Sequence, residues 1–347
     1  MTSFISTQAI SSSMRQSILQ MQSELAASET EVATGNYADI GLSLGATSGE
    51  DVSLQAQTSL LQTLMTTNQT IATQLGTTTT TLSSLQSSAQ NLLNSLLEGD
   101  GSNSNASTIQ ASGEDDLQGL ISSLNSSLNG NYIFGGTNTG TEPVTNYYAA
   151  GAANKAAVDN AFQAAFGMSQ TSSSVSTISG TNMQNFLDTQ FAPLFQGTNW
   201  STNWSSASSQ TLTNQISENQ TASTSVSANN PAFQQLAQAY TMVADLGTQN
   251  LSSSAYQAVS STAQSLLTSA ISNLTDLQAN VGMVQSDVTN ANSQMSLQTN
   301  ILSTQIGNLE SVNTYEVSTR ITDLQSQIED SYALTSQLAQ LSLVKFL

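Results

Sequence analysis

The chain has 347 residues and a net charge of −19, because it contains 23 acidic residues and only four basic ones. It contains neither histidine nor cysteine, which excludes Cys and His nucleophiles, the Ser-His-Asp triad, thiolate or imidazole metal sites and disulfides. Such a charge repels phosphate groups and anionic lipids, so we expect neither nucleic acid nor a membrane surface as a partner.

The N-terminal segment is predicted to be an amphipathic helix. Arg15 is the only basic residue among the first 25, and the apolar residues are spread at helical spacing instead of forming one compact run. This pattern does not match a cleavable secretory leader, and no window approaches the length of a membrane span. The apolar stripe comprises Ile10, Met14, Ile18, Met21, Leu25 and Val32.

A second stripe, from residue 61 to residue 96, steps by three and four residues without a break. Such a heptad pattern predicts a coiled-coil seam. Only Asn68 and Thr78 interrupt it with polar side chains, and the threonine run at residues 77–81 lowers the helix propensity. We therefore expect the isolated arm to be poorly folded until it packs. The apolar members are Leu61, Leu64, Ile71, Leu75, Leu82, Leu85, Ala89, Leu92 and Leu96.

The acids Glu114, Asp115 and Asp116 precede a further apolar stripe, where they suit the positive end of a helix dipole. This arrangement predicts a helix that begins near these acids and ends at Asn129 and Gly130. The β-type residues that follow, closed by two glycines, predict a β-hairpin near residues 130–140.

The middle of the chain differs from the two arms. Pro143 and Pro193 lie there and Pro231 follows just after it, both tryptophans lie between the outer prolines, and segments such as residues 172–178 mix Ser, Thr and β-branched residues. We therefore predict an inserted α+β or β-rich central domain at residues 141–229.

The C-terminal arm repeats the seam pattern, with Gln298 and Gln305 as its polar members. Narrow apolar stripes are stable only when they are buried against another helix, so the simplest pairing is arm against arm. The predicted fold is thus mainly α: a long antiparallel, coiled-coil-like helical rod formed by the N- and C-terminal arms, with the central domain inserted. The apolar residues of the seam are Leu274, Leu277, Val281, Val284, Val288, Ala291, Met295, Leu302, Leu309 and Val312, followed in a terminal helix by Val317, Ile321, Leu324, Ile328, Leu334, Leu338 and Leu341.

Candidate chemistry is sparse. Ser342 and Lys345 match a Ser-x-x-Lys pattern, but no surrounding domain could build an oxyanion hole, so a terminal helix contact is the preferred interpretation. The acidic clusters lack calcium-loop spacing. We predict no catalytic, cofactor or metal site and no enzyme activity. The near absence of charge beside the seams favours assembly with other subunits over a free coiled coil, which usually carries Glu and Lys there.

Several segments resemble the flagellin and hook-associated group of axial proteins, and within it the hook-filament junction (FlgL) family. At the C-terminus these are residues 315–321 (YEVSTRI), 331–335 (SYALT) and 340–347 (QLSLVKFL). Elsewhere they are residues 4–8 (FISTQ), 34–35 (TG), 129–136 (NGNYIFGG), 204–208 (WSSAS) and 239–247 (AYTMVADLG). The loop at residues 36–46 (NYADIGLSLGA) departs from the common pattern and is similar to the variant of alphaproteobacterial relatives.

The resemblance implies an extracellular structural protein that leaves the cell through the flagellar type III route without a cleaved signal peptide. It implies an inner helical domain of residues 1–35 plus 312–347, a rod of residues 36–140 plus 230–311, and an outward-facing central domain. The implied partners are copies of itself in a ring, the other hook-associated junction protein, flagellin, the export apparatus and an export chaperone. A filament-forming flagellin is the alternative, followed by a secreted adhesin whose central domain binds glycans.

Overall fold

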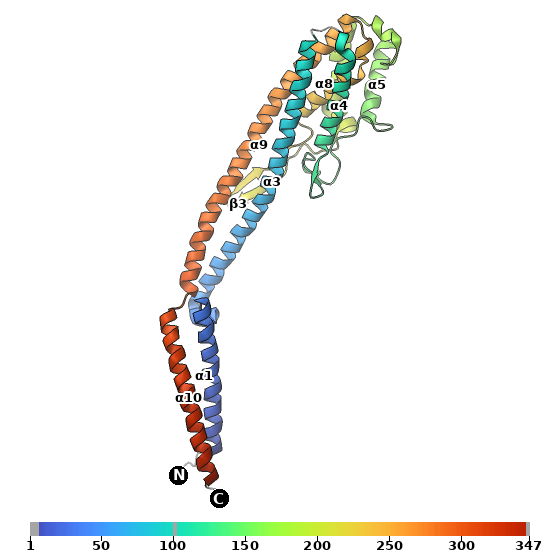
Figure 1. The fold of residues 1–347 in the computed structure, drawn as a ribbon. Helices are drawn as coiled ribbons and strands as arrows, with labels where there is room; N and C mark the ends of the chain where they lie inside the picture. Colours follow the sequence, from blue (N-terminus) through green and yellow to red (C-terminus); the bar gives the residue numbers. More distant parts are fainter. Residues whose placement is uncertain (1–6, 100–102, 345–347) are drawn as a thin grey trace. The chain divides into compact units, whose positions relative to one another are not determined.

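The computed structural model describes the backbone of residues 7–99 and 103–344, and the side chains of residues 9–99 and 104–337. The chain is mainly helical, with long helices in both arms and small antiparallel sheets between them, which confirms the predicted fold class (Figure 1). It divides into two compact units: a terminal unit of residues 1–63 and 295–347, and a central unit of residues 64–294. The three-domain division stays a prediction.

The elements follow one another from the N-terminal arm to the C-terminal arm. The α-helices are α1 (Thr7–Thr34), α2 (Ile40–Leu44), α3 (Ser48–Glu98), α4 (Ala106–Leu124), α5 (Ala153–Phe166), α6 (Gly180–Phe186), α7 (Gly197–Asn199), α8 (Pro231–Asp245), α9 (Ser253–Glu310) and α10 (Thr314–Val344). Short 3₁₀ or π-helical turns are η1 (Gly45–Thr47), η2 (Asn103–Asn105), η3 (Ser173–Thr177), η4 (Leu187–Phe191), η5 (Ala192–Phe195), η6 (Trp200–Trp204) and η7 (Thr248–Asn250). The strands are β1 (Ser127–Leu128), β2 (Asn131–Tyr132), β3 (Thr213–Ser217) and β4 (Gln220–Ser223).

In the terminal unit, α1 and α10 lie side by side (Figure 1). The segments that follow α1 and α9 are connected by backbone hydrogen bonds. Tyr37 N donates to Glu310 O (2.9 Å), and Val312 N donates to Gly35 O (2.9 Å). Gly35 follows α1 with a φ of 75°, a left-handed conformation that favours glycine after a helix. The two interruptions in the helical arms are therefore one paired structural feature.

In the central unit, α3 and α9 pair in antiparallel fashion. Gln86 Nε2 donates to Thr275 Oγ1 (2.9 Å), and Gln278 Nε2 donates to Gln86 Oε1 (3.1 Å). Further along α3, Gln264 Nε2 donates to the carbonyl of Leu96 (3.1 Å). The residue numbers of the partners on α9 fall as the residue numbers on α3 rise. The two helices are therefore antiparallel, as the arm-against-arm pairing predicted.

Asn68, a polar member of the α3 seam, is fully buried. Its Nδ2 donates to the carbonyl of Ile216 in β3 (2.7 Å) and to Oδ1 of Asn292 in α9 (2.8 Å). A buried amide requires such partners, because an unpaired polar group in the interior is costly. The break in the heptad pattern thus marks the place where the β3–β4 hairpin meets the helix pair.

The acids at residues 114–116 lie in the middle of α4, which begins at Ala106, so the prediction that they begin a helix is wrong. The buried stripe of α4 begins before these acids, at small residues such as Ala106, which do not stand out as apolar in the sequence. Gly113 lies where an added Cβ would be 2.9 Å from Cγ1 of Val243, so α4 and α8 approach closely there. The buried residues of α4 are Ala106, Ile109, Gly113, Leu117, Leu120, Ile121 and Leu124.

α4 ends at Leu124, and the chain then forms the short β1–β2 hairpin. Asn129 and Gly130 connect the strands with φ values of 53° and 81°, the pair of left-handed residues typical of a type I′ turn. Residues 172–178, whose composition suggested β structure, form the 3₁₀ turn η3 instead. The β3–β4 hairpin supplies the other sheet of the described residues, with an irregular register between Gln215 and Ser217.

A row of aromatic rings forms the core of the inserted segment. Successive ring centroids are 4.7 to 5.9 Å apart, in tilted, edge-on or stacked geometry. Such rings supply most of the apolar area that a segment with so many Ser and Thr residues can bury. The rings of the row belong to Phe166, Phe162, Phe186, Phe191, Phe195, Trp204 and Trp200.

Candidate subunit-packing surfaces

The terminal pair α1 and α10 buries only a narrow part of the predicted stripe. Buried members are Ile18, Val317, Leu324 and Ile328, whereas Met14, Met21, Leu25 and Ile321 are half-buried. Ile10 and Leu334 are exposed, by 37% and 51%. The side chains of Leu338 and Leu341 lie outside the described residues. Two helices thus leave a substantial part of this apolar stripe uncovered in a single chain.

An ion pair accompanies this seam. Arg320 of α10 places Nη1 3.6 Å from Oε2 of Glu31 in α1, and Oε1 of the same carboxylate accepts a hydrogen bond from the backbone of Ala38 (3.3 Å). Glu31 is buried while Arg320 is half exposed. The contact therefore ties α10 to the end of α1 and partly offsets the charge of a buried acid.

Additional large side chains on the terminal pair are exposed. Leu19 on α1 is 62% exposed, and Tyr315 and Tyr332 on α10 are 83% and 53% exposed. Scattered apolar residues are ordinary on a protein surface, but exposed ones that flank a partly uncovered stripe mark an interaction face. These three residues were not among the predicted packing positions, because they fall outside the regular three-and-four spacing.

The rod seam is covered more completely. Its buried members are Leu61, Ile71, Leu75, Leu82, Leu85, Leu92, Leu274, Val281 and Val288, and its half-buried members are Leu64, Leu277, Val284 and Leu309. Each of these residues lies in one unit, with Leu61 and Leu309 in the terminal unit and the others in the central unit. The seam therefore serves mainly to hold α3 against α9 within one chain.

The outward faces of these helices carry almost no charge. From Val52 to Leu97, α3 contains no Asp, Glu, Lys or Arg, and α9 has none at residues 288–309. In a chain of net charge −19 this leaves long neutral surfaces along which two copies could approach without like-charge repulsion.

The hydroxyl groups of the threonine run in α3 have partners within the helix itself. At residues 77–81 each threonine donates its hydroxyl to the carbonyl four residues earlier, at 2.9 to 3.0 Å. Because these donors are already satisfied, covering this turn of the helix costs fewer hydrogen bonds to water than a polar composition suggests. Thr78 is indeed fully buried in the seam.

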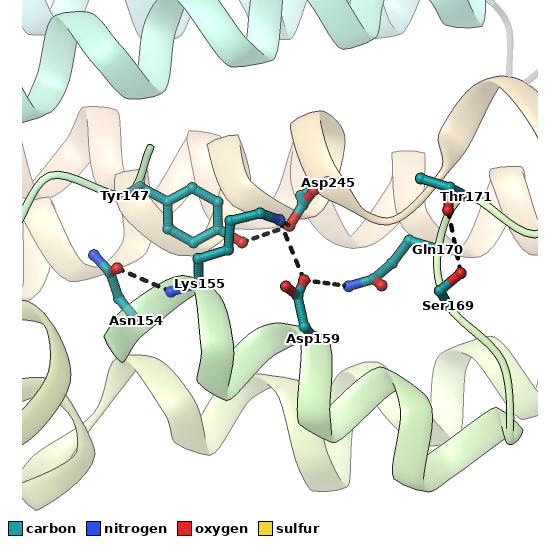
Figure 2. Close-up of polar contacts among 8 residues, drawn as sticks. All are labelled: Tyr147, Asn154, Lys155, Asp159, Ser169, Gln170, Thr171 and Asp245. Carbon is teal, nitrogen blue, oxygen red and sulfur yellow. Dashed lines mark hydrogen bonds and ion pairs between the residues drawn. The ribbon is translucent and has the colours of Figure 1, made fainter. Parts of the chain in front are cut away.

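Figure 2 shows a charged cluster that sequence reasoning missed. Lys155 of α5 places Nζ 2.8 Å from Oδ2 of Asp245 at the end of α8, and 3.2 Å from Oδ1 of Asp159 one turn along α5. Tyr147 donates its hydroxyl to the same oxygen of Asp245 (2.6 Å), and Gln170 donates to Asp159 (3.0 Å). The one available signal was that Lys155 is the only cation between Arg15 and Arg320.

The protonation states in this cluster favour a structural role. Burial, followed by the charge of Asp245, raises the pKa of Tyr147 far above its ordinary value, so the phenol is a neutral donor. Burial lowers the pKa of Lys155, but the hydrogen bonds and charges of Asp245 and Asp159 outweigh it and leave the pKa raised. Lys155 therefore stays an ammonium that ties α5 to the C-terminal end of α8.

The described part of the chain holds no group of three or more His, Cys, Asp or Glu residues placed to bind a metal ion. No helix among the described residues combines the length and apolar character needed to cross a membrane. Lys345 of the Ser-x-x-Lys pattern and the side chain of Ser342 lie outside what the structure describes.

Comparison with known families matches both arms. The family described as the bacterial flagellin N-terminal helical region matches residues 5–139, and the bacterial flagellin C-terminal helical region matches residues 264–347. A search of curated proteins found no match. The N-terminal match covers α1, α3 and α4, and the C-terminal match covers most of α9 together with α10. This chain therefore belongs with the proteins that carry both the N-terminal and the C-terminal helical regions of bacterial flagellin, a structural and non-enzymatic family of the extracellular flagellum.

Proposed function

We propose that this structural flagellar component is a hook-associated junction protein, which connects the hook to the filament. The proposal depends on the C-terminal segment, residues 315–347, whose sequence resembles the end of the hook-filament junction family. That segment contains α10, which pairs with α1 and leaves apolar side chains uncovered. In this account residues 1–35 plus 312–347 form the inner helical domain, residues 36–140 plus 230–311 the rod, and residues 141–229 the outward-facing domain.

Assembly follows from the surfaces described above. Each copy is strongly negative, so contacts between copies use the neutral helix faces and the uncovered apolar residues of α1 and α10. Self-association is a property of the flagellin family. The ring arrangement, the contacts to flagellin and to the other junction protein, passage through the flagellar export apparatus, and the export chaperone belong to the proposal. No catalytic step, cofactor or metal takes part in it.

A pair of exposed α10 residues tests this role without disturbing the fold. Leu334 is 51% exposed and Ser336 is exposed two residues further along the same helix. We expect Leu334→Glu to leave cells with hooks but without filaments, while flagellin is released into the medium. Ser336→Glu adds the same charge and is expected to leave filaments intact.

Truncation of the chain before Ser331 is the stronger form of the same experiment and removes the end of α10. Normal filaments in cells that carry this truncation would contradict the proposed role. Loss of filaments with flagellin still secreted supports a junction protein, because the filament subunit itself is then available but has nothing to build on.

A filament-forming flagellin is the second candidate, and the family matches support it equally. The two candidates differ in copy number. A junction protein occurs in a fixed amount per hook, whereas a flagellin accounts for most of the mass of the filament.

A further inference from the structure

A groove in the central unit lies between the helix pair and the segment around β4. It encloses about 390 Å³. Leu75 of α3 and Leu277, Val281 and Val284 of α9 supply apolar surface, and Ser227 and Asn229 contribute polar groups at its edge. None of the residues that line it is charged, although Asp276 lines a smaller hollow beside it.

The polar edge of this groove is already hydrogen-bonded within the chain. Oδ1 of Asn229 accepts from Nε1 of Trp200 (2.9 Å) and from the hydroxyl of Ser205 (2.7 Å). Ser227 donates its hydroxyl to the carbonyl of Ser208 (2.6 Å). An occupant that displaces water from this edge therefore leaves these bonds intact, which removes the main cost of covering polar groups.

A matching apolar strip lies on α9 in the terminal unit. Leu297 and Ile301 are four residues apart, so they share one face of the helix, and they are 64% and 59% exposed. The surrounding stretch, residues 288–309, carries no charge. The two side chains together form an uncharged apolar surface that another molecule can cover.

We infer that the groove of one copy receives the strip formed by Leu297 and Ile301 of a second copy. Two molecules of charge −19 repel each other least where both contact faces are uncharged, and the groove and the strip meet that condition, so burial of apolar surface can hold them together. The strip and one wall of the groove lie on the same continuous helix, α9, so a chain cannot place its own strip in its own groove, and the occupant is another copy. This inference rests on the self-assembly in the proposed function.

The contact joins two different surfaces and is therefore head-to-tail. Head-to-tail contacts close into rings or extend as helical arrays, depending on the rotation between successive copies. The groove thus provides a second contact between copies, in addition to those of the terminal helices, and the strip helps to select the partner.

Disulfide trapping tests this contact well, because the chain has no cysteine of its own. Asn280 lines the groove and is exposed, so Asn280→Cys in one copy and Leu297→Cys in another should form a disulfide-linked dimer in cells that make both variants. Leu97→Cys, at an exposed leucine of α3 that is 57% accessible, is the matched control and should give no dimer with Asn280→Cys.

The results separate this inference from the proposed function. If both variants enter isolated flagella and no dimer forms, or the control forms it equally, the groove contact is overturned while the junction role stands. If neither unmodified chain nor variants occur in flagella, the proposed function fails and the contact fails with it. As a second readout, changing Leu297 and Ile301 together to Ser should raise the protein concentration needed for self-association about tenfold, whereas Leu97→Ser should leave it unchanged.

Discussion

Replacing Asn68 with alanine removes both hydrogen bonds that join α3 to the hairpin and to α9. The carbonyl of Ile216 is left buried without its donor, which costs about 1–3 kcal/mol. Asn292 is half-buried, so its side-chain oxygen can partly regain a hydrogen bond to water. Losing the bond from Asn68 to Asn292 therefore adds about 0.5–1.5 kcal/mol. We therefore expect Asn68→Ala to lower the free energy of unfolding of the central unit by about 1.5–4.5 kcal/mol.

Urea unfolding followed by tryptophan fluorescence measures this change, because Trp200 and Trp204 are both buried in the central unit. Asn91→Ala is the control: this asparagine is exposed on the same helix, and its loss should change stability by less than about 0.5 kcal/mol. Hydrogen exchange should also become faster in β3. Equal midpoints for Asn68→Ala and Asn91→Ala would show that the hairpin does not depend on the amide.

Three further predictions follow from the charges and the helix composition. Lys155→Met should destabilise the central unit by about 1 kcal/mol, less at high salt, because the ion pairs are partly exposed; an equal loss at all salt concentrations would contradict an electrostatic tie. Burial raises the pKa of Asp116 above 3.8 despite the hydrogen bond from Ser88, so ionising this carboxyl opposes stability increasingly as the pH rises above 3.8 and fully above the raised pKa. Asp116→Asn should therefore stabilise the chain at neutral pH, with the gain fading as the pH falls from the raised pKa to 3.8 and absent below it; pH-dependent unfolding curves measure this, and a gain that persists in acid would contradict it. Circular dichroism should show less helix in the monomer than in the assembled form, because the threonine-rich arms have weak intrinsic propensity, and equal helicity would contradict this account.

Regular spacing made the long helices predictable. The three-and-four stripes on α3 and α9 identify the buried seam even though polar residues dominate the composition, because burial depends on which face is apolar. Residues that lack a strong apolar character were harder to assign. α4 begins at Ala106 rather than near the acids, since Ala106 and Gly113 are buried without looking hydrophobic in sequence.

Contacts between distant residues were not predictable from spacing. Lys155 and Asp245 are 90 residues apart, and nothing near either position indicates the other. The groove is a similar case, because Leu75 and Asn229 meet only through the fold. Sequence patterns therefore predicted the helices and many of the buried positions, whereas the surfaces between elements required the structure.

The most direct test of the proposed junction role is the amount of this chain in isolated flagella, measured by quantitative mass spectrometry before and after the filaments are sheared to shorter lengths. A hook-associated junction protein predicts an amount that follows the number of hooks and does not change with filament length. An amount that falls in proportion to the removed filament mass would contradict the junction role and identify the chain as the filament subunit.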